Sequence, residues 1–352
     1  MTADPGTGIG PAGGALRVDA FLLAGQFPGA GHGDALRAAV TYAQAAERAG
    51  FDGVWLAEHH FVTYGTCPSA VAMAGFVLGR THRLRVGTAA ANLSNRHPVA
   101  LAEEAALLDA VSGGRFDLGV ARGGPWVDLE VFGTGLDRYS PDGFAEALDV
   151  LLATLGGAGT VRGEGARFGF RTVPVVPRPP RALPVWVAAT SPSTVDLAAG
   201  RGLPLLLGVH DTDTGKADLI LRHAQPGAGH VSAHLAYVAD TTAQAEDVLR
   251  DTLPTWLARA GEHVRIDGTT TTRNLADYVE HLLAIHPVGP PDRCVRRLAG
   301  TLTGTGVRRV LLMVEAGGTP ERTIRNIDRL GAEVLPVLRR LPAAAQPPAG
   351  QR

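Results

Sequence analysis

Short apolar runs alternate with longer helical patterns along almost the whole sequence. Segments such as 34–49, 98–111 and 241–258 carry Ala, Leu, Glu and Arg at helical spacing, and glycines such as Gly50, Gly202 and Gly306 separate them from the next apolar run. About eight such repeats predict a parallel sheet with helical crossovers, and favour a closed (β/α)8 TIM barrel over an open doubly wound sheet. The expected strands are Arg17–Leu23, Gly53–Ala57, Leu84–Ala90, Phe116–Ala121, Pro184–Ala189, Leu203–Gly208, Ser232–Ala239 and Val307–Val314.

The length of 352 residues suits one barrel domain. We expect a single barrel over residues 16–341, between disordered tails at 1–15 and 342–352 that are rich in Gly, Ala and Pro. Two insertions interrupt the repeat, at about 157–183 and 260–289. The second is polar and follows the seventh strand, so we expect it to be a lid over the carboxyl end of the barrel.

The charge balance and the cysteine count exclude several functions. The formal net charge is -1, so the chain has no basic excess for a nucleic-acid partner. Cys67 and Cys294 are too few for a disulfide framework or a four-thiolate metal site. The apolar runs have strand length and no secretory signal is apparent, so we expect a cytoplasmic protein with no membrane segment.

A histidine pair follows the second expected strand. Glu58, His59 and His60 lie at the carboxyl rim of a barrel, where active sites form. Adjacent histidines on an extended segment point to opposite sides and are poor ligands for one metal, so we expect no metal site. The local pattern is compatible with two interpretations. Either the histidine is a structural, hydrogen-bonded residue of the rim, or one imidazole faces a pocket and donates or accepts a proton there.

An anion site is the second candidate. Arg122 follows the fourth strand beside two glycines, and Ser191 is the expected N-cap of a helix that begins at Pro192. Taken singly, Arg122 can form a salt bridge and Ser191 can simply cap its helix. Because both lie on the same face of the predicted barrel, together they predict a phosphate site. The small residues 88–92 indicate either tight core packing or a bare wall beside a flat ring.

Several sequence segments together resemble those of the bacterial luciferase-like, flavin-dependent monooxygenases, and of the luciferase α subunit in particular. They are Ala57-Glu-His-His-Phe61, the segment 86–99, the segment 107–116, Gly119-Val-Ala-Arg-Gly123, the segment 187–194 and His286-Pro-Val-Gly-Pro-Pro291. The resemblance runs in order over residues 17–340. It implies a TIM barrel that uses FMN, bound as FMNH2 supplied by a separate NAD(P)H:flavin reductase. It also implies O2 as cosubstrate, activated as a flavin C4a-(hydro)peroxide that oxygenates a small organic substrate.

The resemblance also assigns residues. His59 matches the family's active-site histidine, and the residues that match its FMN phosphate ligands are Arg122, Ser191 and Thr194. Ala89 and Ala90 match the non-proline cis peptide beneath the isoalloxazine. Two further cofactor-site positions depart from the light-emitting α subunit, because Ala121 replaces a reactive cysteine and Thr190 replaces a glutamate. These departures argue against light emission and a long-chain aldehyde substrate, and leave flavin binding intact.

Two alternatives remain beside the monooxygenase. One is a deazaflavin (F420)-dependent oxidoreductase of the same superfamily. The other is a non-catalytic flavin-binding or partner subunit like the luciferase β chain, against which the joint presence of His59, Arg122 and Ser191 argues. We also expect a homodimer, or a heterodimer with a related chain, through the nearly uncharged segment Pro68–Leu78. That segment could equally be an ordinary buried barrel helix.

Overall fold

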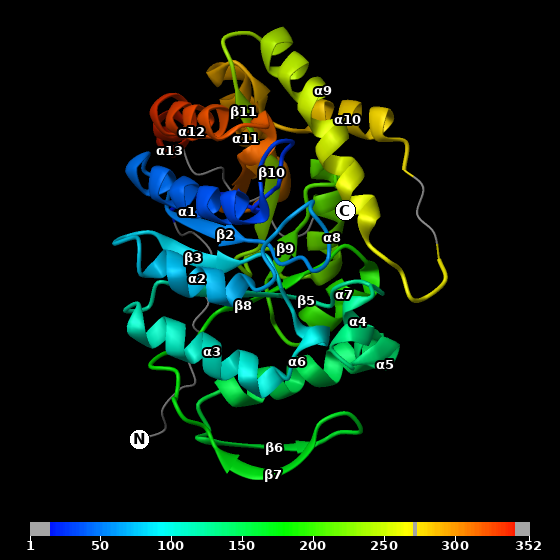
Figure 1. The fold of residues 1–352 in the computed structure, drawn as a ribbon. Coiled ribbons are helices and arrows are strands. Elements are labelled where there is room, and N and C mark those ends of the chain that lie inside the picture. The colour runs from blue at the N-terminus through cyan, green and yellow to red at the C-terminus, as the bar shows by residue number, and fades with distance from the viewer. Residues whose placement is uncertain (1–14, 270–272, 342–352) are drawn as a thin grey trace.

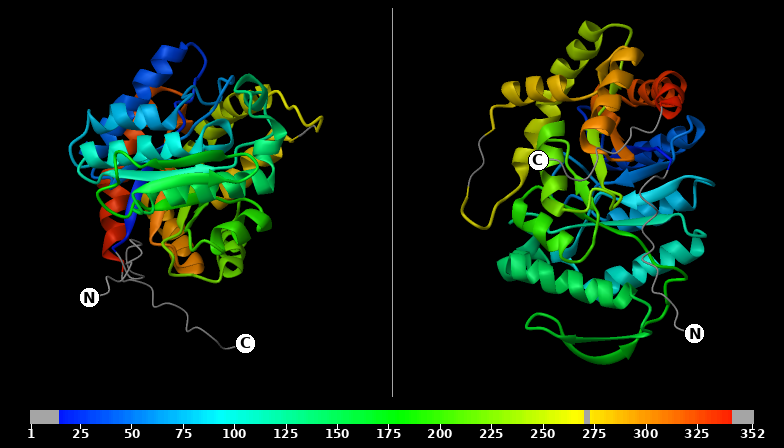
Figure 2. Two further views of the ribbon diagram at one scale, coloured as in Figure 1. Left: turned by 90° about the horizontal axis from the view of Figure 1, so that it is seen from below. Right: turned by 180° about the vertical axis from the view of Figure 1, so that it is seen from behind.

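Eight parallel strands close into a barrel in the computed structural model, which describes residues 15–269 and 273–341 (Figures 1 and 2). Neighbouring strands pair around the ring, and the pairing of β3 with β5 closes it. The TIM-barrel prediction is therefore confirmed, and every expected strand overlaps an observed one. The barrel strands are β1 (Arg17–Leu22), β2 (Gly53–Leu56), β3 (Arg85–Thr88), β5 (Phe116–Ala121), β8 (Val185–Ala188), β9 (Leu205–Leu207), β10 (Val231–Leu235) and β13 (Arg309–Met313).

Helices surround the barrel and cover the outward faces of its strands (Figure 1). The predicted helix 98–111 coincides with α3, and Gly306, at a φ of +73°, ends α11 as expected for a glycine after a helix. The helices are α1 (His32–Arg48), α2 (Ala70–Leu78), α3 (Pro98–Val111), α4 (Asp128–Val131), α5 (Gly135–Tyr139), α6 (Pro141–Leu155), α7 (Pro192–Ala199), α8 (Asp213–His223), α9 (Thr242–Ala258), α10 (Leu275–Ile285), α11 (Pro291–Thr305), α12 (Pro320–Arg329) and α13 (Leu335–Arg340).

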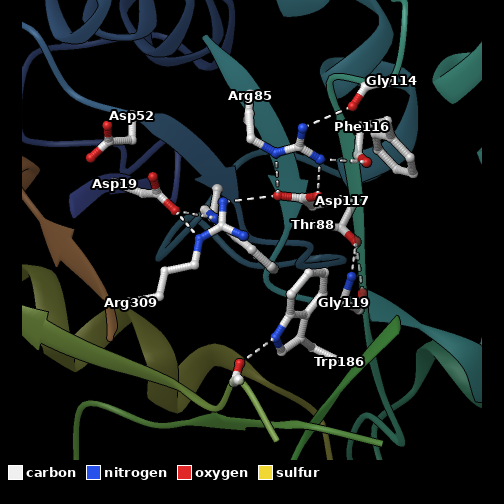
Figure 3. A network of polar contacts seen from close by, with 12 residues as sticks. Asp19, Asp52, Arg85, Thr88, Gly114, Phe116, Asp117, Gly119, Trp186 and Arg309 are labelled. Atoms are coloured by element: carbon white, nitrogen blue, oxygen red, sulfur yellow. Dashed lines mark hydrogen bonds and ion pairs between the residues drawn. The ribbon is translucent and has the colours of Figure 1, made fainter. Parts of the chain in front are cut away.

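A buried ion-pair network fills the amino-terminal end of the barrel (Figure 3). Arg309, the first residue of β13, pairs with Asp19 on β1, and its Nη2 lies 2.8 Å from a carboxylate oxygen of Asp117 on β5. Asp117 also pairs with Arg85 at the start of β3, and the Trp55 indole N–H donates to Asp19 over 2.9 Å. Because ions so deeply buried must be paired, this end of the barrel is a packed floor. A ligand site therefore belongs at the opposite, carboxyl end.

The two insertions contain more structure than the sequence indicates. The first includes a hairpin of β6 (Thr160–Glu164) and β7 (Gly169–Pro174), which lies outside the ring of helices (Figure 1). The second includes α10, and the expected strand 232–239 is divided: β11 (Tyr237–Val238) leaves the barrel and pairs with β12 (Val288–Gly289). A short β4 (Ala91–Asn92) pairs with β5. The expected tails lie outside the described residues, apart from Ala15.

Candidate active site

His59 lies three residues after β2, at the carboxyl end of the barrel. Its backbone N–H donates to the carbonyl of Cys67 over 2.9 Å, and its ring lies 5.3 Å from that of Tyr64. Its Nδ1 is buried without a partner among the described residues. Burial, with a smaller effect of His263, lowers the pKa of His59 to about 4. The imidazole is therefore neutral at pH 7 and can accept a proton.

Glu58 fixes the loop that carries His59. Its carboxylate accepts the backbone N–H groups of Ala70, over 3.1 Å, and Asn92, over 3.0 Å, and it pairs with Arg96 over 2.9 Å. Burial opposes ionisation here, but the nearby His60 imidazole, the charge of Arg96 and the two backbone N–H donors outweigh it and lower the pKa of Glu58. Glu58 is thus ionised at neutral pH and anchors this loop. The local sequence pattern does not predict this role.

The two adjacent histidines have different surroundings. His60 Nε2 lies 3.6 Å from the Glu58 carboxylate, and the His60 ring packs 5.0 Å from that of Phe132. The neighbours of the His59 ring are Tyr64 and His263. The two histidine rings therefore contact different groups.

Arg122 directly follows β5, and its guanidinium carbon lies 4.5 Å from the centre of the Tyr139 ring. Among the described residues, no carboxylate lies within ion-pair distance of it. Strands β5 and β8 are neighbours in the barrel, with Val120 opposite Val187. Arg122 and Ser191 therefore both follow the carboxyl ends of adjacent strands.

Ser191 is the N-cap of α7, and Pro192 is its first residue, as predicted. The Ser191 hydroxyl accepts from the Thr194 backbone N–H over 3.4 Å and lies 3.0 Å from the Thr194 hydroxyl. Thr190, just before the cap, is exposed. Two hydroxyl groups and a helix start thus lie together after the carboxyl end of β8, an arrangement that suits an anion.

Small side chains line the rim between β3 and β5. The peptide bond between Ala89 and Ala90 is cis, Ala89 is buried, and Ala121 at the end of β5 is half-buried. The strands approach closely below this point, because a Cβ on Gly119 would lie 2.1 Å from the carbonyl oxygen of Thr88. The rim here therefore presents the small side chains of Ala89, Ala90 and Ala121.

A strap formed by residues 259–268 crosses the loops at the same end of the barrel, and Figure 1 shows it in yellow after α9. The Val127 N–H donates to the carbonyl of Val264 over 2.9 Å, and the Ile266 N–H donates to that of Pro125 over 3.0 Å. These bonds connect the strap to the loop after β5. The segment thus lies where a lid was expected, as a bridge between loops.

The strap is joined on its other side to the loop after β2. There the Glu262 carboxylate accepts from the Thr63 backbone N–H over 3.0 Å and from its hydroxyl over 2.9 Å. The strap places His263 between His59, with ring centres 6.2 Å apart, and Trp126, at 4.6 Å. Sequence reasoning missed His263 and Trp126, because contacts so distant along the chain leave no local pattern.

The protein is thus a (β/α)8 barrel whose carboxyl end carries a neutral imidazole after β2, an arginine after β5 and the hydroxyl-rich start of α7 after β8. Among the described residues, no three His, Cys, Asp or Glu side chains are grouped to hold a metal ion. No helix in the described part of the chain is long and apolar enough to cross a membrane.

The chain belongs to the luciferase-like monooxygenase family, whose sequence profile matches residues 16–309. It is 30% identical over 354 aligned positions to the alkanal monooxygenase alpha chain of Photorhabdus laumondii, covering 92% of this chain and 98% of the relative. The family resemblance and the assignment as a flavin-dependent monooxygenase are therefore confirmed.

Solved structures confirm the fold. Monooxygenase RslO1 from Streptomyces bottropensis superposes with a TM-score of 0.80 at 20% identity, covering 92% of this chain and 99% of that one. The oxygenating constituent of the Pseudomonas putida 3,6-diketocamphane monooxygenase, in complex with FMN, gives 0.72 at 16% identity, covering 92% and 98%. An F420-dependent secondary alcohol dehydrogenase gives 0.72 at 17% identity, covering 92% and 99%. The family fold thus accommodates flavin-type cofactors of more than one kind.

Proposed function

We propose that this protein is the oxygenating component of a two-component monooxygenase that takes FMNH2 from a separate NAD(P)H:flavin reductase and uses O2 to oxygenate a small organic substrate in the cytoplasm. The observation that carries the proposal is the position of two groups after the carboxyl ends of the neighbouring strands β5 and β8. Arg122, which has no carboxylate partner in the described structure, follows β5, and the hydroxyl-rich start of α7 follows β8.

The residues present fit FMN. Arg122, Ser191 and Thr194 offer a guanidinium and two hydroxyl groups to the phosphate, and the positive end of the α7 helix dipole adds to them. Thr190 adds a hydroxyl at the edge of this site. Ala89, Ala90 and Ala121 present small side chains, against which a flat ring system can pack.

When bound, the reduced flavin supplies the electrons that activate O2, which is chemistry that no protein side chain provides. His59 accepts and returns a proton at the reacting end of the site, since its imidazole is neutral at pH 7. The strap excludes water by joining the loops after β2 and β5 over this end. If proton transfer by His59 or exclusion of water by the strap is lost, we expect the enzyme to release H2O2 in place of product.

The alternative cofactor is F420, because the structurally similar alcohol dehydrogenase was solved in complex with an F420–acetone adduct. The higher identity to alkanal monooxygenase alpha chains supports FMN. A non-catalytic partner subunit is disfavoured because His59, Arg122 and Ser191 are all present. We further propose a dimer, either of two copies or with a related chain, through the face that α2 and α3 share.

Equilibrium titration under nitrogen tests the cofactor proposal. The protein is titrated in parallel with FMNH2 and with reduced F420, and binding is measured by calorimetry. We expect FMNH2 to bind the more tightly, and to lose affinity when inorganic phosphate competes for the anion site. Tighter binding of reduced F420 would identify a hydride-transfer enzyme, and binding of neither would leave the partner-subunit role.

A further inference from the structure

His263 occupies a position that two separate barrel loops determine. Its neighbour Glu262 is bonded to Thr63 on the loop after β2, which also carries His59. Its other neighbour, Val264, accepts a hydrogen bond from Val127 on the loop after β5. The His263 ring is therefore held between these loops by its own backbone, on the strap and not on the barrel itself.

The tautomer of His263 follows from its hydrogen bond. Its Nδ1 lies 2.9 Å from the carbonyl oxygen of Ala260, which can only accept, so Nδ1 carries the proton. Nε2 of the neutral ring is then an acceptor. One face of the ring packs on Trp126, with ring centres 4.6 Å apart, and the side chain is half-buried. His263 thus has access to solvent and a free acceptor nitrogen.

The other groups near His59 cannot carry its proton away. The Glu58 carboxylate is already bonded to Ala70, Asn92 and Arg96, and burial raises the pKa of the Tyr64 hydroxyl, so that group does not ionise near neutral pH. His60 faces Glu58 and Phe132. His263 remains, with its ring centre 6.2 Å from that of His59, a separation that one bridging water can span.

We propose that His263 is the outer member of a two-histidine relay that exchanges protons between His59 and solvent. The inference rests on the proposed role of His59 in the monooxygenase. In the outward direction, a protonated His59 passes one proton to Nε2 of His263, directly or through a water. The His263 imidazolium then releases a proton to solvent and both rings are neutral again. No electron moves in these steps, and no other reactant is required.

The relay is tested in the flavin-free protein, so that the result does not depend on catalysis. Nitrogen-15 NMR measures how fast the His59 ring N–H exchanges with solvent in wild type, His263→Phe and His263→Gln. Phenylalanine keeps the packing on Trp126 and removes both nitrogens. The matched control is His281→Phe, at a histidine on α10 whose Nε2 is bonded to the carbonyl of His210.

We expect exchange at His59 to slow by about tenfold or more in both His263 variants, since a positioned proton carrier contributes at least that much. Added imidazole should restore the rate in His263→Phe, because a diffusing base replaces the missing one, and His281→Phe should behave as wild type. Thermal unfolding shows whether each variant is folded; the Gln variant serves if the Phe variant is not.

Exchange that is unchanged in the folded His263 variants would overturn the relay. So would an equal slowing in His281→Phe, or a slowing that imidazole does not relieve, since either result indicates a merely structural effect. Failure of FMNH2 to bind would instead contradict the proposed function and leave this exchange measurement valid.

Discussion

The guanidinium of Arg122 lies over the ring of Tyr139, 4.5 Å from its centre. An aromatic face attracts a cation without occupying its N–H donors. Tyr139 can therefore hold Arg122 in place while its hydrogen-bonding edge remains available. An arginine held by a carboxylate would have to give up that partner before it bound a phosphate.

Replacing Arg122 with alanine removes a charged hydrogen-bond donor, and such a bond contributes about 1.5–3 kcal/mol. We expect the affinity for FMNH2 to fall about tenfold or more, measured by anaerobic titration. The control is Arg80→Ala. Arg80 also lies over an aromatic ring, that of Phe76, but it follows the carboxyl end of α2. Equal affinities of Arg122→Ala and wild type would exclude Arg122 from the site.

Replacing His59 with alanine should reduce oxygenated product per FMNH2 consumed by roughly a hundredfold, which lies within the usual contribution of positioned proton transfer. The lost product should reappear as H2O2, while FMNH2 affinity changes little. His60→Ala should act through stability, because His60 packs against Glu58 and Phe132. Measuring product and H2O2 together in single turnovers distinguishes them; uncoupling by His60→Ala alone would show that the wrong histidine was assigned.

The barrel could be predicted from the sequence because it depends on local periodicity, which repeats with each strand and helix. The N-cap at Ser191 could also be predicted, since Ser-Pro before a helical pattern is a local signal. The strap could not. Its position depends on hydrogen bonds between residues about 140 to 200 positions apart, such as Glu262 with Thr63 and Val264 with Val127. Polar, Gly-rich segments do not reveal such partners.

Acid should destabilise the protein through its buried histidines. Burial lowers the pKa of His286 to about 3 and that of His230 to about 4, against about 6.5 in an unfolded chain. Below pH 6.5 the unfolded state therefore binds more protons than the folded state. Their contribution to stability is complete above pH 6.5 and is lost as the pH falls towards 3, by up to about 1.4 kcal/mol per pH unit for each group.

Urea unfolding of wild type and His286→Asn between pH 7.5 and pH 4.5 tests this dependence. The variant should lose stability less steeply with acid, because one protonating group is absent from its unfolded state. His32→Asn, at the exposed start of α1, should keep the wild-type slope. Parallel curves for all three proteins would contradict the assignment to His286.

An apolar face on α2 and α3 should mediate dimerisation. Phe76 on α2 is 57% exposed, and Leu107 and Val111 on α3 are 51% and 71% exposed, and the two helices lie side by side (Figure 1). Phe76→Asp should therefore yield a monomer in sedimentation velocity at micromolar concentration. Leu221→Asp, at an isolated side chain on α8 that is 74% exposed, should leave the dimer intact. A monomeric wild type would refute the interface.

The reaction of the enzyme–FMNH2 complex with O2 tests whether this protein uses FMNH2 to activate oxygen. FMNH2 is mixed in a stopped-flow instrument with air-saturated buffer, with and without the protein, and the appearance of oxidised FMN is followed by its absorbance. We expect the protein to delay this appearance strongly, because it holds the reacted flavin in a water-excluded site. We expect Arg122→Ala to lose most of the delay at a fixed low protein concentration. Reoxidation at the rate of free FMNH2, with saturating wild-type protein present, would contradict this use of FMNH2.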